Sequence, residues 1–147
     1  MKHEFAIPLL VHEFSHMQQW IENSKVWSYG KYLDDVDRWL VGDDVKDIDE
    51  KINKIQLLEL DCERRAVKYI LKYSLPINLK IYCQKANAYL FFYTWMRETR
   101  TWSREGNSSY ADKNIELWNK CPTKLKTIGY YRTIPKNIHK KFIECGI

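Results

Sequence analysis

The stretch from about residue 47 to residue 73 constrains the fold most, because apolar side chains recur through it at helical spacing. In steps of four and three residues, the only charged side chain is that of Glu59. The positions in this series are Ile48, Ile52, Ile55, Glu59, Cys62, Ala66, Tyr69 and Tyr73. A stripe of this kind faces the core of a protein. The pattern therefore predicts a long helix that places a single carboxylate, that of Glu59, in the middle of a buried face.

Four further stretches have helical patterns: about 5–23, 31–40, 79–100 and 114–120. The aromatic-rich 79–100 stretch is the expected central helix, with its inner face formed by Ile81, Ala88, Phe92 and Trp95 or Met96. Only five glycines and four prolines occur in 147 residues, so tight turns are few and a sandwich or barrel is disfavoured. After Pro122 the pattern is ambiguous, and only 127–133 resembles a strand.

We therefore expect a mostly α protein of about five helices, packed around the 5–23 helix and the helix that bears Glu59. The length fits a single domain over residues 1–147. Within it, residues 1–100 are expected to form the helical core, and residues 101–147 a loop and a basic C-terminal extension. Hydrophobic residues make up 45% of the chain and charged residues 29%, which is typical of a globular chain rather than a disordered one.

Targeting signals are not visible in the sequence. No run of 18 apolar residues occurs, which excludes a helical membrane span, and the N-terminal apolar stretch lacks the pattern of a signal peptide. The four cysteines are far apart and form no CxxC pair. We therefore expect free thiols in a reducing compartment, the cytoplasm, or the host cytoplasm if the protein is viral.

Charge is distributed unevenly along the chain. Residues 34–50 hold seven Asp and one Glu against Arg38 and Lys46, whereas residues 120–147 hold six Lys and Arg132 against Glu144. The basic tail could contact nucleic acid, with Tyr130, Tyr131 and Arg132 stacking on bases. We do not favour this interpretation, because a solvated basic end accounts for the same pattern.

The chemical signal in the chain is His12-Glu13-Phe14-Ser15-His16, an HExxH motif. On a helix, residues four apart lie one above the other, so two imidazoles can reach one metal ion. Glu13 lies close enough to accept a proton from a metal-bound water. The apolar neighbours, such as Leu9, Leu10 and Trp20, favour a buried helix. The alternative is a pair of histidines that binds no metal.

A zinc site of this type needs a third protein ligand. His3 has a spacing that fits no zinc pattern, and His139 stands in a lysine-rich, solvated context. Glu59 is the better candidate, because a buried carboxylate must be paired, protonated or bound to metal. The alternative for Glu59 is an ion pair with a Lys or Arg of another helix.

The pairing of HEFSH with Glu-Leu-Asp-Cys-Glu at residues 59–63 resembles the thermolysin-like zinc metallopeptidases, or gluzincins. It also resembles small metallopeptidase-like proteins of phage and other viral genomes. The resemblance covers roughly residues 5–100 and implies Zn²⁺ bound by His12, His16 and Glu59. Glu63 stands where that family usually has an Asp that orients a histidine, and Asp61 is a weaker candidate for the role.

The sequence departs from that family in one respect, because only eleven residues precede His12. They are too few for the sheet that usually comes before the HExxH helix and holds an extended peptide. We therefore expect a reduced fold, a different mode of substrate binding, or a groove supplied by a partner.

The function expected from the two motifs is zinc-dependent hydrolysis of an unidentified peptide or protein, with Glu13 as general base. Tyr89 and Tyr93 are candidates for the oxyanion or substrate contact, as are Asn87 and Arg97. A second class of function is a non-catalytic protein in which zinc clips two helices together. A third is a nucleic-acid or viral interaction module built on the basic tail.

Overall fold

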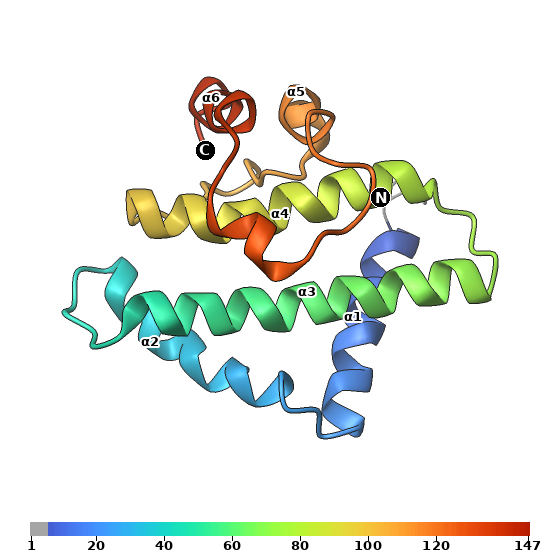
Figure 1. Ribbon diagram of the computed structural model, residues 1–147, viewed down its shortest axis with the longest axis horizontal. Coiled ribbons are helices and arrows are strands. Elements are labelled where there is room, and N and C mark those ends of the chain that lie inside the picture. The colour runs from blue at the N-terminus through green and yellow to red at the C-terminus, as the bar shows by residue number, and fades with distance from the viewer. Residues whose placement is uncertain (1–5) are drawn as a thin grey trace.

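The computed structural model describes residues 6–147 and is helical throughout, with no strand in that range (Figure 1). The mostly α prediction is confirmed. The α-helices are α1 (Ala6–Ile21), α2 (Leu33–Leu40), α3 (Ile48–Lys72), α4 (Leu79–Thr99), α5 (Ile115–Trp118) and α6 (Lys136–Glu144). Three 3₁₀ segments join them: η2 (Trp27–Tyr32), η3 (Asp112–Asn114) and η4 (Ile128–Arg132).

Two long helices, α3 and α4, form the scaffold and lie side by side in Figure 1. The short α1 crosses α3, while η2 and α2 pack along the N-terminal half of α3. Of the elements that follow α4, α5 and η4 contact α4, and α6 contacts α5. In Figure 1, α5 and α6 lie on the side of α4 away from α3. This arrangement places α1 and its HExxH motif directly against α3.

Local sequence explains where the two scaffold helices begin and end. The first turn of α3 carries Asp49 and Glu50, which favour a helix N-terminus. After α3 the chain turns at Ser74, whose φ is 46°, and at Pro76. The Asn78 side chain then accepts a hydrogen bond of 3.1 Å from the Ile81 amide and caps α4.

The main core lies between α3, α4 and the C-terminal third of the chain. As expected, α4 is central and buries 13 of its 21 residues, although Ile81 is 38% exposed and does not belong to the inner face. Residues 101–147 supply fully buried side chains to this core: Leu117, Tyr131, Ile138 and Phe142. The segment expected as a loop and basic extension is therefore packed into the core.

The sequence pattern was misleading for two parts of the C-terminal third. The strand expected at 127–133 is a 3₁₀ turn, η4, that buries Tyr131, and the helix α6 was not predicted. Because Tyr131 is fully buried, it is also not available to stack on bases. The short apolar run at 127–133 gave no period that distinguishes a strand from a turn.

A further correction concerns α1, which is not the buried helix that its apolar residues suggested. Its buried residues are Val11, Ser15 and Gln19, while a second, outward face is apolar and exposed: Leu9, Leu10, Phe14, Met17 and Trp20. The helix therefore rests on α3 through a narrow stripe, and the histidines lie at the edge of that stripe.

The structure also bears on two expectations about the whole chain. No helix within residues 6–147 combines the length and hydropathy needed to cross a bilayer. All four cysteines are free thiols, and Cys62, Cys83 and Cys121 are buried.

Candidate metal centre

The two histidines of the motif lie one turn apart on α1 and turn toward α3. Their ring centroids are 4.7 Å apart and the rings are nearly perpendicular. Both side chains are half-buried, with 19% and 18% exposed for His12 and His16. The helix geometry thus supplies two imidazoles on one face, as the spacing predicts.

Glu59 on α3 meets both rings. Its Oε2 atom lies 3.4 Å from Nε2 of His16 and 3.8 Å from Nε2 of His12. The residue is 8% exposed, and Oε2 is buried without a hydrogen-bond partner. Within residues 6–147 no Lys or Arg forms an ion pair with this carboxylate, so the alternative of a basic partner is not what the structure contains.

The opposite edge of each imidazole is held by an acceptor. Oε1 of Glu63 lies 3.0 Å from Nδ1 of His12, and Oε1 of Gln19 lies 2.8 Å from Nδ1 of His16. Because these oxygens accept, each Nδ1 donates its proton to one of them, which in a neutral ring leaves Nε2 free to bind a cation. Both Nε2 atoms face Oε2 of Glu59, so the three atoms can share either a proton on an imidazole or a cation that lies between them.

A second layer of hydrogen bonds orients these acceptors. The Tyr82 hydroxyl donates to Oε2 of Glu63 at 2.6 Å. The Gln19 amide donates to the Leu58 carbonyl at 3.0 Å and to Asp61 at 2.8 Å, which fixes its oxygen toward His16. Asp61, the weaker candidate for orienting a histidine, therefore acts on His16 only through Gln19.

Two residues of this network, Gln19 and Tyr82, were not predicted. Gln19 had a signal, since it continues the buried i, i+4 row of Val11 and Ser15 as a polar side chain and a buried amide needs partners. Tyr82 had none, because its contact with Glu63 depends on how α4 packs against α3.

The carboxylates shift the titration of their neighbours. Burial disfavours the charged rings, but the hydrogen bond and charge of Glu63 raise the pKa of His12 above its ordinary value, and Glu59 does the same for His16. Burial, together with the negative charge of Glu63, raises the pKa of the Tyr82 hydroxyl, so it stays a donor. Glu59 and Glu63 therefore favour positive charge at the two imidazoles.

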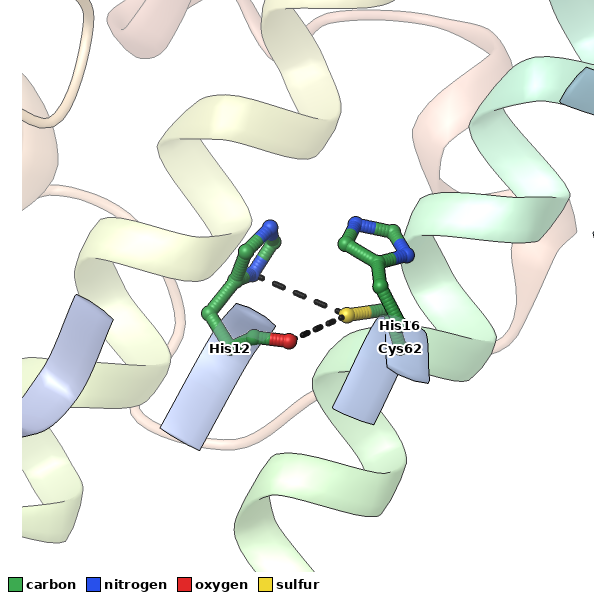
Figure 2. Close-up of side chains that lie close together, drawn as sticks. All are labelled: His12, His16 and Cys62. Atoms are coloured by element: carbon green, nitrogen blue, oxygen red, sulfur yellow. Dashed lines mark hydrogen bonds between the residues drawn. The ribbon is translucent and has the colours of Figure 1, made fainter. Parts of the chain in front are cut away.

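Cys62 is an alternative to Glu59 as the third ligand, and the sequence analysis did not single it out (Figure 2). Its Sγ and one nitrogen of each histidine lie within 4.8 Å of one another. However, Sγ lies 3.3 Å from the His12 carbonyl, to which it donates, and 3.7 Å from Nδ1 of His12, the atom that Glu63 already engages. Burial and the nearby Glu63 also raise the pKa of the thiol, so Glu59 fits the Nε2 atoms better.

A groove of about 950 Å³ opens beside His12, between α1, the start of α4 and the loop at 110–112. His12 and the exposed Glu13 form part of its wall, as does Tyr89. The Tyr89 ring centroid lies 6.4 Å from that of His12. Tyr93 is buried behind it, and the two hydroxyls are 2.8 Å apart, so Tyr89 alone of this pair lines the groove.

The remaining candidates lie elsewhere. Asn87 is fully buried and bonds the carbonyls of Pro122 and Lys124. Arg97 donates to the Arg132 carbonyl, and His139 lies 3.4 Å from Glu98. None of these three lines the groove, which corrects the expectation that Asn87 or Arg97 could serve there. His3 lies outside the described residues.

Comparisons of this chain with protein-family models, with curated proteins and with solved structures found no match. Functional inference therefore rests on the geometry of the site.

Proposed function

We propose that His12, His16 and Glu59 bind a divalent metal ion and that the protein is a metal-dependent hydrolase. The metal we favour is zinc, because two imidazoles and a carboxylate are ligands typical of a zinc site. One observation carries the proposal. The Nε2 atoms of both histidines and a buried carboxylate oxygen without a hydrogen-bond partner converge on the same space. A cation there would satisfy all three atoms at once.

When bound, zinc supplies Lewis acidity that lowers the pKa of a coordinated water and polarises a carbonyl. Glu13 is exposed on the groove wall and can accept the proton that the attacking water loses. Burial and the charge of Glu59 raise the pKa of Tyr89 well above its usual value, so its hydroxyl remains a donor for a developing oxyanion.

A peptide or protein is the substrate class we favour. The support is the resemblance to gluzincins, in which a second helix carries the third ligand and, one turn later, an acid that orients a histidine. Glu59 and Glu63 stand four residues apart on α3, and Glu63 contacts Nδ1 of His12.

The metal proposal is tested by metal analysis and zinc titration of the purified protein. The parent is expected to bind one zinc per chain, and Glu59→Gln, which keeps the shape of the side chain, to lose most of the affinity. Cys62→Ser is the matched control and is expected to keep it. If Cys62→Ser lost zinc while Glu59→Gln retained it, the ligand set proposed here would be wrong.

The hydrolase proposal is tested with a mixed peptide library and mass spectrometry. Glu13→Gln is expected to bind zinc like the parent but to lose cleavage by a factor of about 10² to 10⁴, the usual contribution of a general base. Equal cleavage by parent and variant would exclude Glu13 from the reaction. If neither the parent nor the variant cleaved any peptide while zinc was bound, the proposal of a peptidase would be wrong.

A non-catalytic zinc clip is the second candidate, favoured by the narrow contact between α1 and α3. Only Val11, Ser15 and Gln19 of α1 are buried, so a metal bridge to Glu59 would add much to the docking of this helix. In this case chelation should unfold the protein, whereas a hydrolase keeps a folded apoprotein.

A further inference from the structure

A second cavity, of about 1130 Å³, lies between the C-terminal half of α3, the start of α4 and residues 123–125. It shares no lining residue with the groove beside the histidines. Six basic side chains line it: Arg64, Arg65, Lys68, Lys72, Lys80 and Lys124. Its two acids, Glu22 and Asp61, are each bound by Arg65 at 2.7 Å, so five cationic side chains remain without an acidic partner among residues 6–147.

Three of these cations form a regular row on α3. Arg64, Lys68 and Lys72 are four residues apart and exposed, which separates successive members by about 6 Å along the helix. Like charges at this spacing destabilise a helix. Arg64 donates to the Lys126 carbonyl, and the Lys72 ammonium lies 5.1 Å from the centre of the Tyr73 ring. Neither lysine of the row forms an ion pair with an acid among residues 6–147, so the charge of the row is not neutralised there.

An aromatic row runs beside the cationic one. Tyr69 and Tyr73 follow Lys68 and Lys72 by one residue, and their rings are stacked at 6.3 Å with an angle of 20° between planes. Tyr73 is 58% exposed, and Tyr69 lines the cavity. Tyr69 is half-buried, with its ring against that of Phe14, so Tyr73 is the aromatic side chain that is accessible next to the evenly spaced positive charges.

We propose that this cavity, with the Tyr69–Tyr73 row, binds single-stranded nucleic acid. The regular spacing suits a polymer with one phosphate per residue, and the exposed Tyr73 ring offers a surface on which an unpaired base stacks. An isolated phosphate would need one or two cations and no ring. An acidic peptide would use the charges but not the aromatic row, and in a duplex the base faces are already stacked.

The site differs from the C-terminal tail, where nucleic-acid contacts were considered from the sequence. Tyr131 in that tail is buried, whereas Lys68, Lys72 and Tyr73 on α3 are exposed. The contribution of the tail is Lys124, which faces the cavity from the opposite wall. The proposal does not depend on metal at the other site, because His12, His16 and Glu59 do not line this cavity, although Asp61 lines it and also contacts Gln19.

Fluorescence anisotropy with a short labelled oligothymidylate tests the charge row. The double variant Lys68→Gln/Lys72→Gln is expected to bind at least about tenfold more weakly and to reduce the slope of log K against log salt by about 1.4. The double variant Lys113→Gln/Lys136→Gln removes the same charge from exposed positions outside the cavity and should change binding less than twofold. Equal losses in both double variants would overturn the proposal.

A second pair of variants tests the aromatic row. Tyr73→Ala is expected to weaken binding about tenfold, the effect of losing one stacked base, while Tyr73→Phe keeps the ring and should bind like the parent. Unchanged affinity in Tyr73→Ala would overturn the stacking proposal. Equally tight binding of duplex DNA or of polyglutamate would show that charge alone is recognised and would also overturn it.

Discussion

At the scale of single residues, the main feature of the candidate site is the set of hydrogen bonds that orients the two imidazoles. Glu63 and Gln19 hold the Nδ1 atoms, and Tyr82 and Asp61 hold these two acceptors in turn. Such outer contacts fix the tautomer and raise the basicity of a ligating ring. The site is therefore oriented before any metal binds.

This orientation predicts the effect of a conservative change. Glu63→Gln keeps the length of the side chain but removes its negative charge and one acceptor, so His12 and Tyr82 compete for the remaining oxygen. We expect zinc affinity to fall by about 10- to 100-fold, measured by competition with a chromogenic chelator. Glu13→Gln, which removes an exposed charge next to His12 in the chain, is the control and should change affinity little. An unchanged affinity in Glu63→Gln would contradict the role given to Glu63.

At the scale of elements, α1 differs from the other long helices in how it is held. It buries three residues against α3, and much of its apolar surface faces outward. By contrast, α4 is buried along most of its length. Helices with few buried contacts open first in the native state, so the docking of α1 is the step that a metal would affect.

The consequence can be measured by amide hydrogen exchange. Zinc is expected to slow exchange of the α1 amides between Val11 and Gln19 by about tenfold or more, because the ion joins α1 to α3 and stabilises the docked state. Amides in the middle of α4 should change much less. The Glu59→Gln variant should lose the zinc effect, and slowing at α4 alone would contradict a bridge between α1 and α3.

For the whole molecule, the C-terminal third is part of the structure that holds α4. Phe142 on α6 is fully buried, and its ring stacks on Trp95 with centroids 5.2 Å apart. The Trp95 indole also donates to the Ile147 carbonyl at 2.9 Å. The last residues of the chain thus belong to the main core.

Removing that contact should destabilise the whole domain. Phe142→Ala is expected to lower the free energy of unfolding by about 3–5 kcal/mol, through lost burial and a new cavity. Its neighbour Ile143 is 60% exposed, and Ile143→Ala should cost about 0.5 kcal/mol or less. Urea unfolding followed by circular dichroism measures both. Similar values for the two variants would show that α6 folds apart from the core.

Alkaline pH should reveal the same burial of the C-terminal third. Burial raises the pKa of Tyr131 to about 12, above the value of about 10 in the unfolded chain. The phenol contributes stability below pH 10 and loses it as pH rises from 10 toward 12, by up to about 1.4 kcal/mol per pH unit. Tyr131→Phe starts less stable but should decline less steeply, which unfolding at several pH values will test. Equal slopes would contradict the prediction.

The sequence predicted the features that depend on helical geometry within one segment. The stripe through Glu59 and the spacing of His12 and His16 follow from 3.6 residues per turn, so the pattern placed a carboxylate on a buried face and two imidazoles on one side of a helix. The long helices α3 and α4 were predicted for the same reason. The structure adds that these three side chains meet.

Other features required the tertiary structure, because they depend on which face of each segment meets another. Contacts such as Tyr82 with Glu63, or Cys62 with His12, join residues whose separation in the chain gives no period to detect. The outward apolar face of α1 also escaped the sequence, since hydrophobicity alone cannot distinguish a side chain that is buried from one that is exposed. Local periodicity determined the helices and their ligand-bearing faces, and only packing between distant segments decided the network around the site and the place of the C-terminal third.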